Sequence, residues 1–252
     1  MNALIKQRLL PVALFLLLFP TTVSSQEGPD AKSRPDPRRV FTDLANPYRN
    51  LKDYTVRIQT KVNMPTIRIP DFTATLYFKK PDRFQIETKS FAPLPRNSGL
   101  FNPFQFDPEK NRIAYQRTES LNGVQADLYR VEPLDSKIMV RYFTIWTGES
   151  PARILQVESL SFRGTKGIVK LSYRNVEQGS EMWLLPDKVH VHLTFPEGAP
   201  NADAWSLTTK DNPVSGGMRQ LDEVSGEGDL DLAYSDWQVN TGLDDRLFEK
   251  KK

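Results

Sequence analysis

Two histidines are the residues of this sequence whose spacing best suits chemistry. His190 and His192 are its only histidines, and apolar residues flank and separate them. Residues two positions apart on a β-strand project from the same face, so the two imidazoles would lie next to each other. A carboxylate such as Asp187 or Glu197 would complete a metal site with them. A pair of polar residues on the solvated face of a strand is the simpler interpretation, so we predict no metal and no other cofactor.

Nucleophilic catalysis has little support in the sequence. The chain contains no cysteine. Its nearest match to the Gly-x-Ser-x-Gly nucleophile elbow is residues 148–152, in which Ala152 replaces the second glycine and Pro151 follows Ser150. We interpret this segment as a hairpin turn. The sequence therefore predicts a protein that is not an enzyme.

The amino-terminal 25 residues have the pattern of a signal peptide. Lys6 and Arg8 precede an apolar run from Leu9 to Phe19, and a small polar stretch follows up to Ser25. The apolar run has 11 residues, whereas a helix that spans a membrane needs about 20. We predict cleavage near Ser25 and no permanent membrane anchor.

Cleavage there would also remove most of the excess positive charge. Without Lys6 and Arg8, the count of lysines and arginines falls from 34 to 32 against 31 acidic residues, which leaves a net charge of +1. Such a chain has no surplus of cations to follow phosphates, so we predict no binding of nucleic acid. The absence of cysteine also removes the acylated residue that would anchor a lipoprotein. We expect a soluble protein of the periplasm.

An alternation of apolar and polar residues dominates the chain after one short amphipathic helix. The helix is predicted over 38–51, where Asn46-Pro47 kinks or ends it. The predicted strands share a period of two and are separated by turn residues: 54–63, 72–79, 83–87, 113–117, 126–131, 138–146, 153–162, 168–173, 181–185, 189–195 and 230–239. This series predicts a mainly β fold with one large antiparallel sheet, in a single domain over 38–249 that follows a disordered lead-in at 26–37.

The apolar face of this sheet needs a larger cover than the helix supplies. A helix of about 14 residues has a footprint of about 21 × 10 Å, whereas ten strands span roughly 45 Å. The sheet must therefore curl around a concave apolar space, which is a favourable place for a ligand. The alternative is that phenylalanine and tyrosine side chains fill this space completely.

The candidate lining of the concave space is the inward apolar set of the first three strands. These residues are Val56, Ile58, Val62, Phe72, Leu76, Phe78, Phe84 and Ile86. The apolar face of the helix supplies the candidate lid residues Phe41, Leu44 and Tyr48.

Two long connections interrupt the pattern of strands. The first, over 93–111, is rich in proline and asparagine and carries Phe101, Phe104 and Phe106, which makes it a further candidate lid. The second, over 196–228, contains several prolines and a pair of glycines. Loops of this length inside a domain tend to be functional or mobile.

Two segments of the chain carry a family resemblance. Phe72–Glu87 contains a strand that ends in the turn Lys80-Pro81-Asp82-Arg83-Phe84, and Leu232–Phe248 leads from a strand to Asn240 and then to the pair Leu247 and Phe248. Together they resemble the outer-membrane lipoprotein carrier superfamily, the LolA-like or lipoprotein-sorting proteins, over most of 38–249. The resemblance implies a strongly curved, unclosed antiparallel β-barrel, with helices covering an apolar concave face that shelters acyl chains.

One feature of the family is not carried over to this chain. In the carrier, an arginine near the first strand holds the lid through backbone hydrogen bonds. Arg57 lies near the right place, but the alternation puts it on the polar face, so we do not assign it that role.

We therefore expect a carrier or chaperone that binds lipid, or the acyl chains of lipoproteins, for transfer toward the outer membrane. Inner- and outer-membrane transfer proteins would then be its partners. The alternative is a non-enzymatic interaction or sensor module of the cell envelope on the same scaffold. In that case the cavity is vestigial, and the polar sheet face or the long loops bind another envelope protein.

Overall fold

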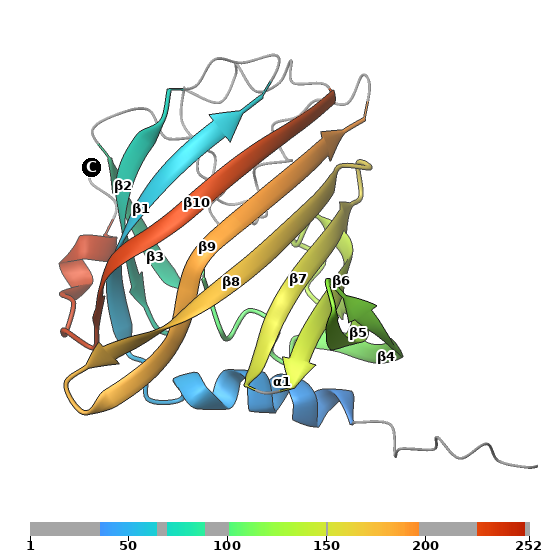
Figure 1. Cartoon of the computed structure of the whole chain (residues 1–252), viewed down its shortest axis with the longest axis horizontal. Coiled ribbons are helices and arrows are strands. Elements are labelled where there is room, and N and C mark those ends of the chain that lie inside the picture. The colour runs from blue at the N-terminus through green and yellow to red at the C-terminus, as the bar shows by residue number, and fades with distance from the viewer. Residues whose placement is uncertain (1–35, 65–69, 89–100, 150, 197–225, 250–252) are drawn as a thin grey trace, which may run out of the picture. The chain divides into compact units, whose positions relative to one another are not determined.

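A single antiparallel sheet of ten strands makes up most of the described structure (Figure 1). This computed structural model describes residues 36–64, 70–88, 101–149, 151–196 and 226–249. The strands follow the order β3-β2-β1-β10-β9-β8-β7-β6-β5-β4, so β3 and β4 end the sheet without pairing to each other. The predicted fold class, mainly β with an unclosed antiparallel sheet, is confirmed.

The strands have the following bounds: β1 Asp53–Asn63, β2 Phe72–Lys79, β3 Arg83–Thr88, β4 Asn111–Leu121, β5 Val124–Pro133, β6 Val140–Glu149, β7 Ala152–Ser161, β8 Lys166–Gln178, β9 Glu181–Phe195 and β10 Gly226–Val239.

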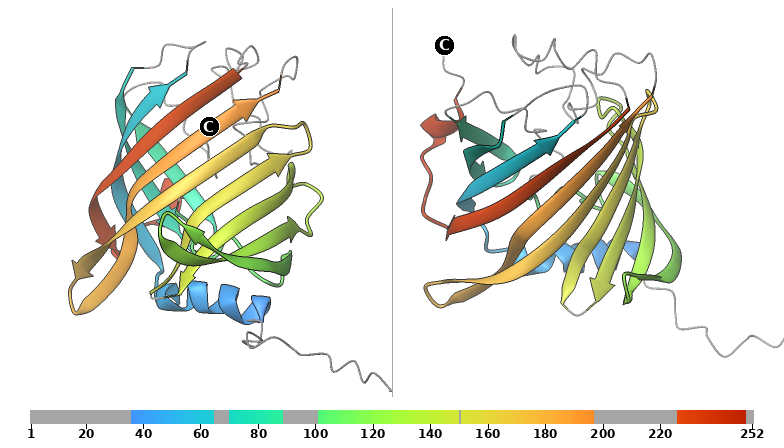
Figure 2. Two further views of the ribbon diagram at one scale, coloured as in Figure 1. Left: turned by 45° about the vertical axis from the view of Figure 1, so that its right-hand side comes forward. Right: turned by 45° about the horizontal axis from the view of Figure 1, so that its top comes forward.

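Helical structure is short in the described part of the chain. It comprises α1 (Pro37–Ala45) and the 3-10 turns η1 (Asn46–Tyr48) and η4 (Asp245–Phe248). The α-helix ends at Asn46-Pro47 as predicted and continues as the 3-10 turn η1. Asn46 keeps helical dihedral angles, so the helix ends because Pro47 has no N–H to donate to the carbonyl oxygen of Asp43. The helix contacts β4 and β7 at one end of the sheet (Figures 1 and 2). The prediction of several helices over the concave face is not confirmed, since α1 is the only α-helix in the ranges described.

No helix in those ranges combines the length and the apolar character that a bilayer-spanning segment requires.

The alternation predicted from the sequence places one apolar face on the inside of the curl. Antiparallel pairing aligns inward side chains from β1 across to β4 in one row: Val62, Leu230, Val191, Val169, Val157, Ile145, Tyr129 and Tyr115. Side chains on one face of paired strands contact each other directly. This row therefore forms a continuous apolar surface across eight strands.

Irregularities in the ladder accompany the strong curl of the sheet (Figure 2). The register shifts between Thr55 and Arg57 against β10, and again in the β4–β5, β6–β7 and β8–β9 pairs. Asp236, opposite the first shift, has a positive φ of 54°. An extra residue in one strand bends that strand and increases its twist, so these positions help the sheet to wrap around its apolar face.

One sequence-based boundary is wrong. The segments 181–185 and 189–195 were predicted as two strands, but β9 runs through both without a break. Pro186 lies where the register of β8 shifts, between Ser172 and Tyr173. A proline is tolerated at such an irregularity because the ladder there does not need its missing N–H.

The carboxyl-terminal segment is fastened to the start of β1 by a buried carboxylate. Asp53 is 2% exposed. Its oxygens accept hydrogen bonds from the backbone N–H groups of Thr241, Gly242 and Leu243 at 2.8 to 3.4 Å. The side chain of Asn240 accepts from the N–H of Lys52 at 2.7 Å. We call this set of contacts the terminal clasp, and it gives a structural reason for the asparagine that contributed to the family resemblance.

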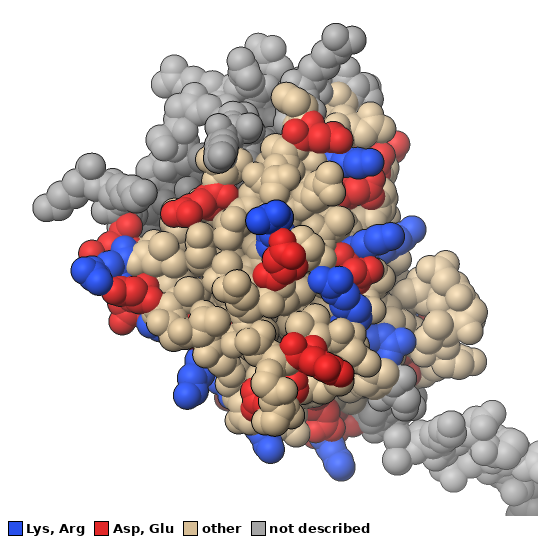
Figure 3. All heavy atoms as spheres, turned by 60° about the vertical axis from the view of Figure 1, so that its left-hand side comes forward, with Lys and Arg blue, Asp and Glu red and all other residues tan. Residues whose placement is uncertain are grey.

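Ion pairs extend the clasp to β2 and β3. Asp245 contacts Lys79 at 2.7 Å and Arg83 at 2.8 Å. The Arg83 guanidinium also faces the ring of Phe248, 5.4 Å from its centroid. On the face shown in Figure 3, acidic and basic side chains are interspersed rather than gathered in patches of one sign.

Several predictions fall partly or wholly outside the described residues. The leader at 1–25 and nearly all of the lead-in at 26–37 lie there, as does most of the connection at 196–228. The first part of the connection at 93–111 also lies there, whereas 101–111 is described.

Candidate functional site

The eight candidate lining residues come together in one apolar cluster on the inside of the sheet. We call it the larger cluster, and its buried members are Tyr48, Leu51, Tyr54, Val56, Ile58, Met64, Phe72, Ala74, Leu76, Phe78, Phe101, Trp183, Leu185, Val189, Val191, Leu193, Phe195, Leu230, Leu232, Tyr234, Trp237 and Val239. Five of the candidates are among these, and Val62, Phe84 and Ile86 pack against them while partly buried.

Strand register explains why these candidates meet. Tyr54 of β1 lies opposite Phe78 of β2, which in turn lies opposite Phe84 of β3. The rings of Tyr54 and Phe78 stack with centroids 4.9 Å apart, and those of Phe78 and Phe84 are 5.0 Å apart. The next inward row is formed in the same way by Val56, Leu76 and Ile86.

The three candidate lid residues divide between two clusters. Tyr48 belongs to the larger cluster, where its hydroxyl donates to the carbonyl oxygen of Leu184 at 2.6 Å. Phe41 and Leu44 of α1 belong instead to a smaller cluster, whose other buried members are Tyr129, Val131, Val140, Phe143 and Ile145. The helical segment therefore touches both halves of the apolar face.

Residues 101–106, which we call the aromatic segment, contact both clusters. The ring of Phe101 is buried in the larger cluster, and Phe104 packs against it. Phe106 packs edge-on to Phe143 in the smaller cluster, with ring centroids 5.3 Å apart. Lys80 lies over the ring of Phe104, 4.5 Å from its centroid. The predicted lid at 93–111 thus contributes, in its described part, aromatic rings to the apolar interior.

Two successive turns present these phenylalanines. Asn102 accepts from the N–H of Phe104 at 2.9 Å through its side chain, and Asp107 accepts from the N–H of Glu109 at 2.9 Å in the same way. In each turn the asparagine or aspartate is followed by a proline. Both are residue types that favour the first two positions of a β-turn. The sequence of the segment therefore sets its backbone locally.

One buried hydrogen bond joins the aromatic segment to β1. The Tyr54 hydroxyl donates to the carbonyl oxygen of Phe101 at 2.6 Å. Burial raises the pKa of Tyr54 well above its ordinary value, so this phenol stays protonated and remains a donor. Trp237 packs edge-on to both rings, with centroids 5.1 Å from Tyr54 and 6.5 Å from Phe101.

Three buried polar atoms in or beside the larger cluster have no hydrogen-bond partner in the described part of the structure. They are Oγ1 of Thr60 and the indole nitrogens Nε1 of Trp183 and Trp237. Thr60 projects from the apolar face of β1, opposite Phe72, and is fully buried. A buried polar group without a partner is unfavourable, so these atoms offer hydrogen-bonding capacity to a polar group that enters the interior.

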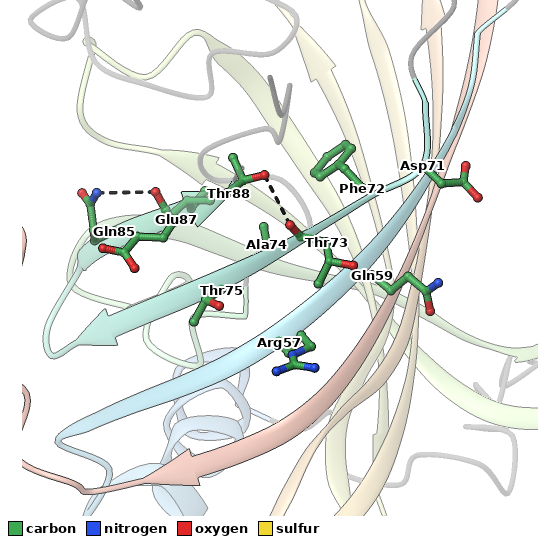
Figure 4. A pocket seen from close by; sticks show the side chains of 11 residues that line it. Arg57, Gln59, Asp71, Phe72, Thr73, Ala74, Thr75, Gln85, Glu87 and Thr88 are labelled. Carbon is green, nitrogen blue, oxygen red and sulfur yellow. Dashed lines mark hydrogen bonds between the residues drawn. The ribbon is translucent and has the colours of Figure 1, made fainter. Parts of the chain in front are cut away.

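A groove of about 1060 Å³ lies over β1, β2 and β3 (Figure 4). Its lining is mostly polar: Arg57, Gln59, Asp71, Phe72, Thr73, Ala74, Thr75, Gln85, Ile86, Glu87 and Thr88. The groove therefore differs from the purely apolar cavity expected from the sequence. Phe72, Ala74 and Ile86 also line it, but their side chains lie on the opposite face of these strands and belong to or pack against the larger cluster, so the polar part of the groove lies on the outer face of the sheet.

The remaining sequence candidates for chemistry have ordinary structural partners. His190 pairs with Asp231 and His192 with Asp229, each at 2.8 Å across the β9–β10 ladder. No group of three or more residues able to hold a metal ion occurs in the described ranges. Arg57 pairs with Asp236 at 3.3 Å on the polar face, as the alternation predicted.

The hairpin interpretation of 148–152 agrees with the backbone around it. Glu149 and Ala152 pair as the last rung between β6 and β7. Ser150 lies outside the described residues.

Sequence reasoning missed several aromatic members of the larger cluster, and two of them, Tyr54 and Trp237, contact the aromatic segment. Tyr54 follows the same alternation as Val56 and Ile58, so extending that pattern by one step would have found it. Trp237 is three residues from Tyr234, and yet the two rings stack 11° from parallel, with centroids 5.7 Å apart. The irregularity at Asp236 brings both to the inside, and a simple period of two cannot predict this.

Solved structures with the same fold include a protein of the LolA superfamily. A LolA superfamily protein from Nitrosomonas europaea is 12% identical, with a TM-score of 0.53, and the match covers 85% of this chain and 97% of that one. A DUF1329 family protein from Desulfovibrio piger is 13% identical, with a TM-score of 0.51, and the match covers 85% and 98%. No family model matches the sequence, and a search of curated proteins finds no match. The resemblance to the LolA-like superfamily is thus confirmed at the level of the fold.

Proposed function

We propose that this protein is a periplasmic carrier that binds lipid, or the acyl chains of lipoproteins, on the apolar concave face of its sheet. The chains would be passed toward the outer membrane, with inner- and outer-membrane transfer proteins as partners. The predicted leader at 1–25 would direct the protein across the inner membrane, and residues 38–249 would form the working domain. The role requires binding and release and no chemical step.

The observation that carries this proposal is the apolar interior, which extends to the unpaired edge of the sheet at β3. Phe84 and Ile86 of this edge strand pack against the larger cluster while only partly buried. Polar side chains on the other face of β1, β2 and β3 line the groove at the same edge. An amphiphile has a long apolar part and a polar head, and the two faces of this edge offer a surface for each.

The gain from sheltering an acyl chain is large enough to drive binding. At about 0.8 kcal/mol for each CH₂ group, keeping a chain of sixteen carbons out of water is worth on the order of 13 kcal/mol. The cost of displacing side chains that occupy the interior would offset part of that gain. The aromatic segment is the first candidate for displacement, since it enters the interior from a connection between strands.

Extraction of bound lipid from the purified protein tests the proposal. We would purify the wild type and two single variants without detergent and analyse the extracts by mass spectrometry. Ile86→Glu places a charge on the apolar face of the edge strand β3, and Gln125→Glu adds the same charge at an exposed position of β5 outside the groove and the clusters. We expect lipid with the wild type and with Gln125→Glu, and little with Ile86→Glu. The proposal fails if the wild type carries no lipid and takes up none from vesicles.

The second candidate function is a non-enzymatic interaction or sensor module of the cell envelope. The dense aromatic packing around Phe101 favours it, because an interior filled by the chain's own rings has no need of a ligand. Crosslinking in cells distinguishes the two functions. A module of this kind would yield one dominant protein partner, and it would do so equally with the wild type and with Ile86→Glu.

A further inference from the structure

The contacts of Phe101 resemble those that an acyl ester would make. The residue presents an apolar ring to the larger cluster and, directly beside it, a carbonyl oxygen to a buried hydroxyl. An acyl ester has the same two parts in the same order, an apolar chain joined to a carbonyl group. No strand ladder in the described structure includes residues 101–106, which lie between β3 and β4.

The surroundings of this carbonyl are built for a hydrogen-bond acceptor. Tyr54 is fully buried and is held by stacking on Phe78, so its hydroxyl is fixed in direction. The indole N–H of Trp237, whose ring packs against both Tyr54 and Phe101, has no acceptor in the described structure. A purely apolar chain would leave the Tyr54 hydroxyl without an acceptor once Phe101 was displaced, whereas an ester or amide carbonyl in the same place would accept from it.

We infer that Phe101 occupies the ligand's own position, and that the ligand is an acyl ester or amide whose carbonyl accepts a hydrogen bond from Tyr54. This inference rests on the proposed function and names the chemical class of its ligand. The aromatic segment is then an internal competitor, which covers the apolar surface and satisfies Tyr54 while the protein is empty. A ligand therefore has to replace both the ring of Phe101 in the larger cluster and the carbonyl oxygen of Phe101 at the Tyr54 hydroxyl.

The test uses two probes that differ only at the carbonyl group. They are lysophosphatidylcholine with a fourteen-carbon acyl ester chain and its ether-linked analogue with an alkyl chain of the same length. Dissociation constants would be measured by tryptophan fluorescence on the purified protein, below the concentration at which the probes form micelles. We expect the ester to bind about 3- to 10-fold more tightly than the ether, which is the range for one neutral hydrogen bond.

Three variants distinguish the effect of the Tyr54 hydrogen bond from the effect of competition by Phe101. Tyr54→Phe keeps the stacked ring and removes the hydroxyl, so the ratio of ester to ether affinity should fall to about one. Phe101→Ala should tighten both probes by about ten-fold or more and leave that ratio unchanged, because it removes the competing ring. Phe162→Ala is the control, since Phe162 is an exposed phenylalanine outside the aromatic segment and the apolar clusters, and its loss should change neither affinity. Circular dichroism would verify that each variant is folded.

The possible failures are distinguishable. If the wild type binds both probes equally, or if Tyr54→Phe keeps the preference for the ester, this inference is overturned and the proposed function stands. If Phe101→Ala leaves both affinities unchanged, Phe101 does not compete with the ligand, and the inference is likewise overturned. If neither the wild type nor any variant binds either probe, the proposed function fails together with it.

Discussion

Asp53 gives the sharpest test of how the carboxyl-terminal segment is held. Its carboxylate is 2% exposed and accepts hydrogen bonds from three backbone N–H groups, those of Thr241, Gly242 and Leu243. Substitution by alanine would leave these donors without their acceptor in a partly buried place. A hydrogen bond to a charged group contributes about 1.5–3 kcal/mol. Because water can reach some of the freed donors, we expect Asp53→Ala to lose about 3 kcal/mol rather than the full sum.

A second variant, Asp53→Asn, removes the charge of the side chain but keeps nearly the same shape. Asp53→Asn keeps one acceptor oxygen but turns an NH₂ group toward backbone donors, so we expect a loss of about 2 kcal/mol. The assay is urea unfolding followed by circular dichroism, together with thermal unfolding. For a chain of this size, about 3 kcal/mol corresponds to a fall in Tm of roughly 6–12 °C.

Two results would refute the reasoning about the clasp. The first is a loss below about 1 kcal/mol for Asp53→Ala, which would mean that water replaces the carboxylate without penalty. The second is an equal loss in the control Glu109→Ala, which removes an ion pair with Arg38 in which both side chains are mostly exposed. Exposed pairs of this kind contribute little to stability. Hydrogen exchange at residues 241–243 should accelerate in Asp53→Ala and not in the control.

Two further predictions concern acid stability and close packing. Hydrogen bonds from Lys79 and Arg83 hold the pKa of Asp245 below its usual 3.8. Such a group stabilises the fold above its usual pKa and loses this effect as the pH falls through its lowered value, so the wild type should lose more stability than Asp245→Asn between about pH 5 and pH 2. Gly228→Ala should lose about 1–3 kcal/mol in urea unfolding, because its Cβ would lie 2.7 Å from Cγ of Met64.

Each of these two predictions has a clear contrary outcome. Parallel losses of stability with pH in the wild type and Asp245→Asn would mean that the ion pairs with Lys79 and Arg83 do not stabilise the fold. For the glycine, the matched control is Gly148→Ala, whose Cβ would meet Leu155 at an ordinary 3.5 Å. Equal stability of the two glycine variants would show that Met64 moves aside freely.

The strands β1, β2 and β3 could be predicted because their alternation and the turn between β2 and β3 depend on residues that are close together in the sequence. An inward side chain at every second position and the turn at Lys80-Pro81-Asp82 set its strands to within about one residue of those observed. Most of the later strands are longer than predicted, since their outer parts carry polar residues on both faces and are held by ladder bonds to neighbours; β7 keeps its predicted length. The strand β8, for example, extends to Gln178 although its apolar alternation weakens after Tyr173.

The parts that could not be predicted depend on contacts between distant segments. Pro186 indicated a break, but its position opposite an irregularity in β8 lets β9 continue. The hydrogen bond from Tyr54 to Phe101 joins residues 47 positions apart, and no local pattern encodes it. The candidate lining of the concave space was therefore found from alternation, whereas the aromatic segment that reaches it was known only as a phenylalanine-rich connection.

The unpaired edge strands β3 and β4 would allow the two halves of the apolar face to move apart. No ladder in the described structure joins β3 to β4, and the aromatic segment connects the two halves of the apolar face through the rings of Phe101 and Phe106. Separating those halves breaks side-chain contacts and, at Tyr54, one hydrogen bond, but it leaves every rung of the sheet in place. Under the proposed function, the interior would widen across these unpaired edges to fit the size of the bound chain, while the strands keep their ladder pairing.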